Sequence, residues 1–335
     1  MQWYLYQYRE DQSIRIIRVY GDMPEVILPD TICGNPVVEI GAYCFAQKEI
    51  IEKETLYFIA RQNGNGTTEV DKKALDSAIE QGHIRVLAGD YLQAVLMPDT
   101  VRILGTLAFY QCRNLLKLRI GQNLQEIGSD AFMNCRNLRD LYIRGHVDEI
   151  SGLKQILQQR EKETRVFFEA NGSIEAAFLY PEYSQSYELI GPAHIFGWNI
   201  VGEGFRARQC FESGILQVHE YDQIFLQECA EESVETLCEM AMLRLKYPYA
   251  LDEESKQRYQ DYIRLHLKSM VKHLVDTKDI TFIRYLSEDM IEPEIMDLFM
   301  REAVKSQWIE GTRMLLEWQS HQKKEKKDAY DFEDF

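Results

Sequence analysis

The chain has 335 residues, of which 45% are hydrophobic and 27% charged, and its formal net charge is −16. These totals are typical of a folded protein rather than a disordered or collagen-like one. The length allows two domains, or a repeat array joined to one globular domain. The acidic excess argues against nucleic acid as a partner, because binding it requires a basic surface.

The sequence contains neither a basic leader followed by an apolar segment nor an apolar run long enough to span a bilayer. The seven cysteines lie far apart. This spacing is typical of reduced, buried thiols and not of a disulfide framework. We therefore expect a cytoplasmic protein without a membrane partner.

The first pattern in chain order lies in VILPDTICGNPVVEIGAYCFAQ, residues 26–47, where Pro-Asp-Thr is followed by Glu-Ile-Gly and then by Phe45. The same elements return later in the chain, after an interruption. Within the interruption NGNG indicates a loop, and VDKKALDSAIEQG, residues 70–82, predicts an amphipathic helix.

The pattern returns twice, as GTLAFYQCRNLLKL at residues 105–118 and GSDAFMNCRNLRDL at residues 128–141, an offset of 23. A period in the twenties with apolar residues at a fixed phase predicts coils that bury their apolar sides against their neighbours. We expect Phe109 and Phe132 to stack inside these coils. Gly105 and Gly128 are expected in tight turns.

These three copies resemble the BspA-type leucine-rich repeat in order, spacing and residue type, over about residues 14–157. The resemblance implies a solenoid with an extended binding sheet, a protein-binding role and a bacterial source.

After the repeats, TRVFFEANGSIEAAFLYPEY has two apolar runs around Asn171-Gly172 and predicts a β-hairpin. Gly and aromatic residues are frequent in the segment that follows. The sequence thus predicts a β-rich connector or cap over residues 161–217.

Helical periodicity begins at about residue 218 and predicts five or six helices, with Pro248 ending one helix and Pro293 in the first turn of another. The predicted class is α+β. Its predicted parts are a short leucine-rich repeat solenoid in 1–160 with a helical insertion near 70–82, the connector at 161–217, an all-α domain at 218–320, and a charged tail at 321–335 that is not expected to fold alone.

Alternation in LLKLRI and LRDLYI predicts strands with Leu118 and Ile120 inward and charged residues outward. Outward residues and the aromatic tail are therefore the candidate partner-binding residues, although a merely solvated face and an inert or folded-back tail remain open. The candidates are Arg102, Lys117, Arg119, Tyr142, Arg144, Tyr330, Phe332 and Phe335.

Catalytic and metal-binding motifs are absent from the sequence, and we expect no cofactor. Cys112 and Cys135 occupy equivalent phases, which favours packing. Cys210, with His194 and His219 nearby, is the one candidate for a thiol nucleophile. The sequence favours a non-enzymatic adaptor or scaffold that binds another protein. The alternatives are a hydrolase centred on Cys210 and a regulatory or structural subunit bound through its helical domain.

Overall fold

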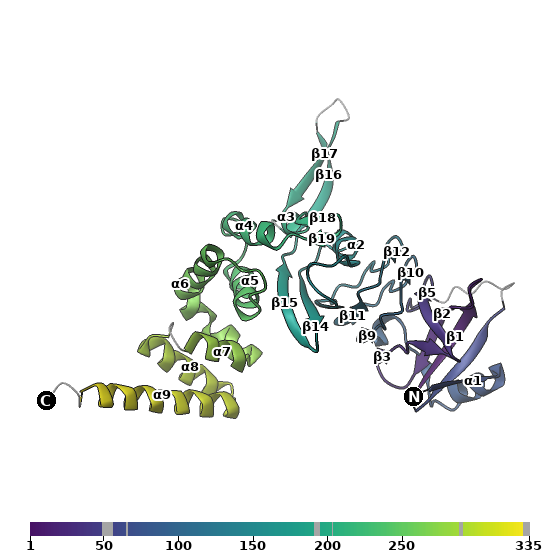
Figure 1. The fold of residues 1–335 in the computed structure, drawn as a ribbon, viewed down its shortest axis with the longest axis horizontal. Coiled ribbons are helices and arrows are strands. Elements are labelled where there is room, and N and C mark those ends of the chain that lie inside the picture. The colour runs from purple at the N-terminus through teal and green to yellow at the C-terminus, as the bar shows by residue number, and fades with distance from the viewer. Residues whose placement is uncertain (49–55, 65, 191–194, 203, 288–290, 331–335) are drawn as a thin grey trace. The chain divides into compact units, whose positions relative to one another are not determined.

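The structure is a computed structural model that describes residues 1–335 except 49–55, 65, 191–194, 203, 288–290 and 331–335. It contains two compact units, Met1–Glu232 and Ser233–Phe335 (Figure 1). The first unit combines parallel and antiparallel strands with short helices. The second is helical.

Two ladders of parallel strands give the first unit its main framework. In the shorter ladder, β10 pairs with both β5 and β12, and β2 (Ile14–Gly21) pairs with the other side of β5. Its repeat strands are β5 (Asn35–Ile40), β10 (Ile103–Leu104) and β12 (Glu126–Ile127). The longer ladder, in spatial order, is β3 (Glu25–Ile27), β9 (Ala94–Leu96), β11 (Lys117–Gly121), β13 (Asp140–Arg144) and β14 (Thr164–Ala170).

Between the ladders, equivalent phenylalanines of successive coils form a stack. The ring centroids of Phe45 and Phe109 are 4.9 Å apart and those of Phe109 and Phe132 are 5.5 Å apart, with both pairs nearly parallel. All three side chains are buried. The predicted Phe109–Phe132 stack is therefore confirmed. Phe45 extends it across the interrupted segment.

Gly105 opens a turn, because its carbonyl accepts from the Ala108 N–H at 3.3 Å, and turn residues also follow Gly128 directly. Neither glycine adopts a positive φ. A Cβ at Gly105 would lie 2.4 Å from the Ala42 nitrogen, and a Cβ at Gly128 would lie 2.3 Å from the Thr106 nitrogen. The missing Cβ at these glycines thus permits the backbones of adjacent coils to approach closely.

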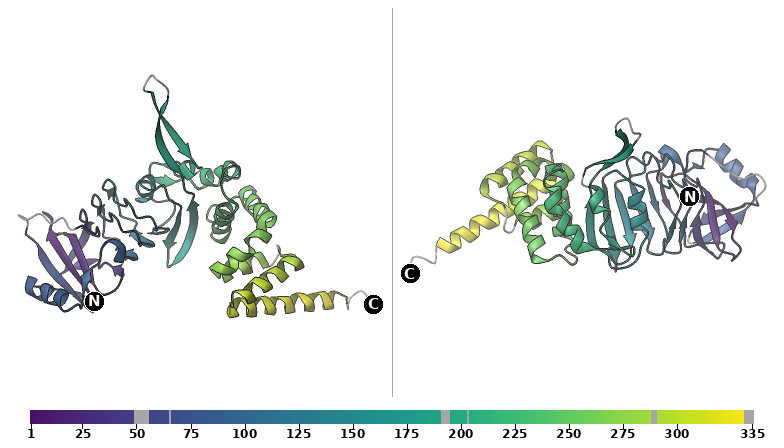
Figure 2. Two further views of the ribbon diagram at one scale, coloured as in Figure 1. Left: turned by 180° about the vertical axis from the view of Figure 1, so that it is seen from behind. Right: turned by 90° about the horizontal axis from the view of Figure 1, so that it is seen from above.

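An antiparallel group of strands covers the N-terminal end of the coils (Figure 2). Here β1 pairs with both β2 and β6, and β6 pairs with β7. The predicted helix is confirmed as α1, with Asp71 as its N-cap. The elements are β1 (Gln2–Tyr8), β4 (Thr31–Ile32), β6 (Phe58–Asn63), β7 (Gly66–Val70), α1 (Lys72–Glu80) and β8 (Arg85–Val86).

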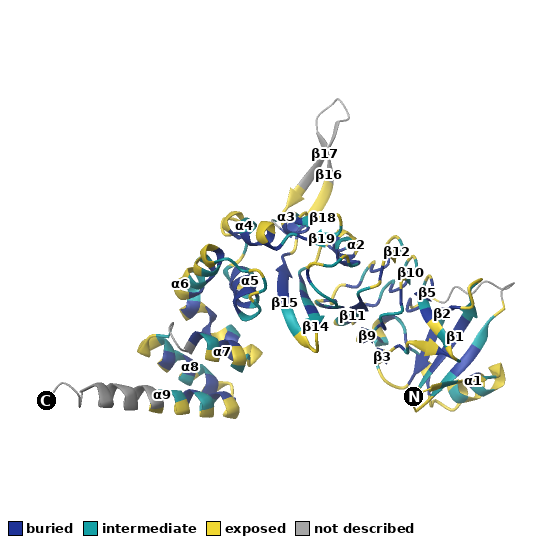
Figure 3. Ribbon diagram, viewed as in Figure 1, coloured by how far each residue is buried: buried dark blue, intermediate teal, exposed yellow. Residues whose placement is uncertain are grey.

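At the other end of the coils, β14 continues the parallel ladder and turns back into β15 (Ser173–Tyr180). The predicted hairpin is confirmed, with φ of 51° at Asn171 and 79° at Gly172. The last five residues of β15 are buried (Figure 3).

Two buried arginines stabilise this end. Arg160 donates to the carbonyls of Cys135 and Leu138, and Arg208 donates to those of Arg160, Pro181 and Gly204. Burial lowers the pKa of Arg160 and of Arg208 to about 10, so both remain charged at neutral pH. The carbonyls replace the water that these cations lose on burial.

The first unit continues to α4, which packs on the hairpin through Tyr221, whose hydroxyl accepts from the Leu179 N–H. The sequence grouped α4 with the later helices. The remaining elements of the first unit are α2 (Leu153–Gln158), β16 (Ser184–Ile190), β17 (Ile195–Val201), α3 (Gly204–Ala207), β18 (Phe211–Glu212), β19 (Ile215–Leu216) and α4 (Val218–Glu228).

The described residues of the second unit form α5 (Val234–Lys246), α6 (Glu253–Thr277), α7 (Ile280–Ser287), α8 (Pro293–Lys305) and α9 (Ile309–Tyr330). Pro293 and Pro248 have the predicted roles at a helix start and after a helix end. Residues 321–330 continue α9 and so extend a helix that begins at Ile309. Lys, Glu and Gln are good helix formers, and extending a helix costs less than starting one.

Phe109→Ala is expected to lower the free energy of unfolding by about 3–5 kcal/mol, because it leaves a cavity between two stacked rings. Denaturant titration followed by circular dichroism measures this change. The matched control is Leu116→Ala, whose side chain is 52% exposed and which should cost about 0.5 kcal/mol or less. Equal losses in the two variants would contradict a structural role for the stack.

Candidate functional site

The register of β11, β13 and β14 aligns the outward residues of the longer ladder into rows, which we name the outer face. Their neighbours Leu118, Ile120, Leu141 and Ile143 are buried, as the alternation predicts. The rows are Lys117, Asp140 and Arg165; Arg119, Tyr142 and Phe167; and Gly121, Arg144 and Glu169.

Aromatic rings form the centre of the outer face. Tyr142 and Phe167 stack with their centroids 4.8 Å apart, and the Lys117 ammonium lies 4.0 Å from the Tyr142 ring centroid. A cation over an exposed aromatic ring gains about 0.5–1 kcal/mol. These contacts orient three large side chains against one another on the sheet.

Ion pairs surround the aromatic centre. The Nε of Arg119 lies 2.6 Å from Glu169 Oε2, and the Nε of Arg165 lies 2.6 Å from Asp140 Oδ1. Arg144 reaches across the coils to Asp99 at 2.9 Å. Each such pair on a surface adds about 0–1 kcal/mol to stability. Their main effect is to orient the guanidinium groups and to balance the charge of the face.

The outer face also contains a depression of about 530 Å³, located where Arg119, Arg144 and Glu169 meet the β14–β15 turn. Asn171 and Gly172 form the opposite wall. The arginines of the two strands and the hairpin turn therefore enclose a concave feature on an otherwise flat sheet.

His146 lies two residues after β13. Its Nδ1 is 2.9 Å from Glu175 Oε1, and the other carboxylate oxygen accepts from the Val147 N–H at 3.1 Å. The hydrogen bond from Glu175 raises the pKa of His146, and the charge of Glu175 adds to this effect. Protonation of His146 therefore strengthens the link between the end of β13 and β15.

The structure brings together four of the candidate residues, Lys117, Arg119, Tyr142 and Arg144, and separates Arg102 from them. Arg102 is exposed directly before β10, in the shorter ladder. Tyr330 ends the backbone of α9, but its side chain lies outside the described residues, as do Phe332 and Phe335.

Sequence reasoning missed Phe167 and the acidic partners Asp99, Asp140 and Glu169. The alternation in TRVFFEA marks Phe167 and Glu169 as same-face residues. Phe167 and Glu169 join the outer face only because β14 pairs with β13. The local sequence contains no signal for that pairing.

The surroundings of Cys112, Cys135 and Cys210 favour structural roles for these cysteines over catalytic ones. Cys112 Sγ donates to the Phe45 carbonyl and Cys135 Sγ to the Phe109 carbonyl, both at 3.1 Å. Burial raises the pKa of Cys210 to about 12, and Glu220 adds to the shift. A thiol nucleophile needs its thiolate form, so these surroundings disfavour attack by Cys210. His194 lies outside the described residues.

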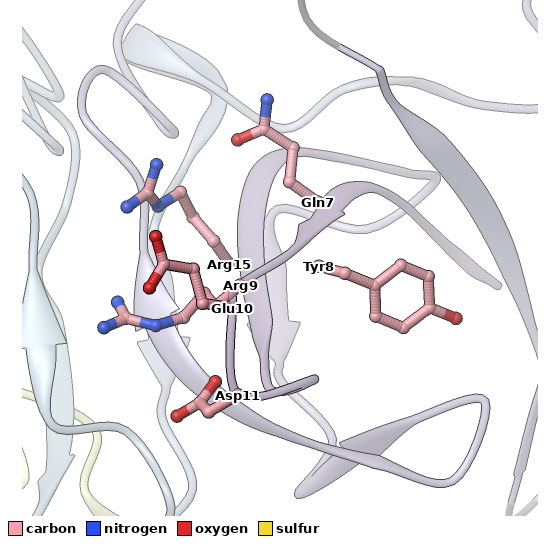
Figure 4. Close-up of a pocket in the computed structure, with 6 residues that line it drawn as sticks. All are labelled: Gln7, Tyr8, Arg9, Glu10, Asp11 and Arg15. Atoms are coloured by element: carbon pink, nitrogen blue, oxygen red, sulfur yellow. The ribbon is translucent and has the colours of Figure 1, made fainter.

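A second polar depression, of about 500 Å³, lies at the turn between β1 and β2. Figure 4 shows Arg9, Glu10 and Arg15 on one side of this hairpin, with Tyr8 pointing to the other side. Arg9 and Arg15 both form ion pairs with Glu39. The two guanidinium groups are therefore already held by a carboxylate.

In the part of the chain that the structure describes, no group of three or more His, Cys, Asp or Glu is placed to hold a metal ion. Among the described helices, none is both long and apolar enough to cross a membrane.

Glu175→Gln is expected to lower the pKa of His146 toward its ordinary value, because it removes the charged hydrogen-bond partner. An NMR titration of the imidazole measures this. Since folding raises the pKa of His146, the pair stabilises the fold fully below the unfolded-state pKa and loses this contribution as the pH rises through the folded-state pKa. Asp148→Asn, which removes a weaker influence, is the control and should shift the pKa less. An unchanged pKa in Glu175→Gln would contradict the assigned contact.

Comparison with known proteins identifies the repeats. The model of the BspA-type leucine-rich repeat region matches residues 85–172, in six copies. A leucine-rich repeat protein of T. pallidum is 24% identical over 42% of this chain and 50% of its own, with a TM-score of 0.28. A leucine-rich cell surface protein of Faecalibacterium prausnitzii is 21% identical over 42% of this chain and 28% of its own, with a TM-score of 0.26.

This chain thus spans half or less of the length of these two proteins. The comparison with curated proteins found no match. The family match covers the coils that contain Phe109 and Phe132 together with β13 and β14. Residues 85–172 of this chain are therefore a BspA-type leucine-rich repeat region.

Proposed function

We propose that this chain is a non-enzymatic adaptor or scaffold that recognises another protein through the outer face. The observation that carries the proposal is the Tyr142–Phe167 stack with Lys117 over it, framed by oriented arginines. Tyr and Arg are enriched among the residues that dominate binding energy at protein interfaces. Side chains that are already ordered lose little entropy on binding.

The charge pattern of the outer face supports a partner with both acidic and basic groups. Arg119, Arg144 and Arg165 each lie against a carboxylate, so the face presents alternating charges instead of a basic patch. A polyanion would meet Asp140 and Glu169 as well as the arginines. Together with the net charge of −16, this arrangement disfavours nucleic acid.

We also place the protein in the cytoplasm. The thiols of Cys112 and Cys135 donate hydrogen bonds within the buried stack, and this use requires their reduced form. A reducing compartment maintains that form.

The test begins with affinity purification of the full chain from its native cells to identify the partner. Tyr142→Ala is then expected to weaken binding by about 30-fold, the loss typical of a dominant interface residue. Arg119→Glu should also weaken it. Because Arg119→Glu places two carboxylates together, the double variant Arg119→Glu/Glu169→Arg restores the ion pair with reversed polarity and should fold normally without regaining binding.

The matched control is Arg102→Glu, the same change at an exposed position of the shorter ladder. It should leave affinity unchanged. The proposal fails if Tyr142→Ala and the charge-swapped double variant both bind the partner as the natural protein does.

A second candidate function is that of a complex subunit bound through the helical unit. Its support is the set of large apolar side chains exposed there, namely Leu265, Val304, Ile309 and Leu316. Contiguous apolar patches mark protein-binding surfaces, and Ile309 and Leu316 lie seven residues apart on α9, a spacing that puts both on one side of the helix.

Ile309→Ser/Leu316→Ser in the full chain distinguishes the two candidates. The proposed role of the outer face predicts unchanged affinity in this variant, because both substitutions lie in α9. Surface plasmon resonance with the purified partner measures it. A loss of binding here, with Tyr142→Ala still active, would favour the helical unit.

A further inference from the structure

A cavity of about 570 Å³ lies in the N-terminal part of the first unit, between α1 and the antiparallel strands. Its lining comes from α1 and from β1, β2, β6, β7 and β8, which belong to a different sheet from β13 and β14. Volumes of this size are typical of small-molecule sites. The cavity is independent of the outer face and of the function proposed for it.

The walls of the cavity are mainly apolar. Leu5, Ile59 and Leu75 are buried and belong to the local hydrophobic core. Leu75 is the one buried residue of α1, so most of this helix remains exposed beside the strands (Figure 3). The Ile79 side chain, 37% exposed, continues the apolar wall one turn further along α1. Water in such a cavity is displaced favourably by an apolar group.

The aromatic residues Tyr20, Tyr57 and Phe58 also line the cavity. Their rings offer flat surfaces that attract cations as well as apolar groups.

The rim of the cavity is acidic. Glu69, Asp71 and Asp76 are exposed there beside one base, Lys72, so three carboxylates and one ammonium give a formal rim charge of −2. Asp71 accepts the N–H of Ala74 as the helix cap. Within the described residues, neither Glu69 nor Asp76 forms an ion pair. Two carboxylates at the mouth are thus available to a cationic ligand.

From this combination we propose that the cavity binds a small amphipathic organic cation, with an alkyl or aryl body and an amine or quaternary ammonium head. The body fills the apolar walls, and the head lies at the rim near Glu69 and Asp76. An anionic amphiphile of the same length would place its charge against these carboxylates. The rim carboxylates therefore favour a positive charge on the ligand, and the apolar walls favour an apolar body.

Isothermal titration calorimetry of the full chain with decyltrimethylammonium and with decanoate tests the proposal, both below their micelle-forming concentrations. These probes share the apolar chain and differ in the sign of the head. We expect saturable binding of one cation per chain, about tenfold tighter than decanoate, with a preference that declines at high salt. Methyl signals of Ile79 and Val86 should shift in NMR spectra, and that of Ile309 should not.

Glu69→Gln/Asp76→Asn should remove most of the preference for the cation. The matched control is Glu80→Gln, which removes a carboxylate from the same helix at a position that does not line the cavity. It should leave affinity unchanged. The proposal is overturned if neither probe binds, or if decanoate binds as tightly as decyltrimethylammonium. It is also overturned if Glu80→Gln weakens binding of the cation as much as the single substitution Asp76→Asn does. Equal losses in these two variants indicate diffuse attraction to an acidic surface.

Discussion

The close approach of successive coils is the constraint on which the first unit depends. Parallel pairing fixes the spacing, and rings at equivalent positions must then stack face to face, as Phe45, Phe109 and Phe132 do. The same spacing leaves no room for a Cβ at Gly105 or Gly128. One geometric condition thus selects both the stacked rings and the glycines of the repeat. The parallel pairing also aligns the side chains of the outer face, because its rows follow the strand register.

A stack of this kind has two apolar ends, and the chain closes each by different means. Antiparallel strands and α1 cover the first end with a small core around Trp3 and Leu75. At the second end, Arg160 and Arg208 bind carbonyl groups that no further coil can reach. Repeat arrays generally need such terminal structures. In this chain the N-terminal structure also contains the cavity beneath α1, so a part that closes the stack has room for a ligand.

The periodic part of the structure could be predicted from the sequence, and the non-periodic part could not. The phase of Phe109, Phe132, Leu118 and Ile120 follows from a repeated local pattern, and so does the helix α1 from its apolar spacing. The pairing of Arg144 with Asp99 joins residues in different coils, and the addition of Phe167 to the face depends on which strand lies beside β13. These are properties of the assembled sheet. For the same reason the candidate site was predicted with Lys117, Arg119, Arg144 and Tyr142 but without the carboxylates that lie against the arginines in the folded face.

The interruption between the coils of Phe45 and Phe109 has a consequence for the route of folding. The contact between Cys112 Sγ and the Phe45 carbonyl joins positions 67 residues apart, whereas the equivalent contact between Cys135 and Phe109 spans 26. Closing the longer segment costs about 0.8 kcal/mol more in chain entropy. Chain entropy therefore favours formation of the contact between the downstream coils over formation of the contact that reaches back to Phe45.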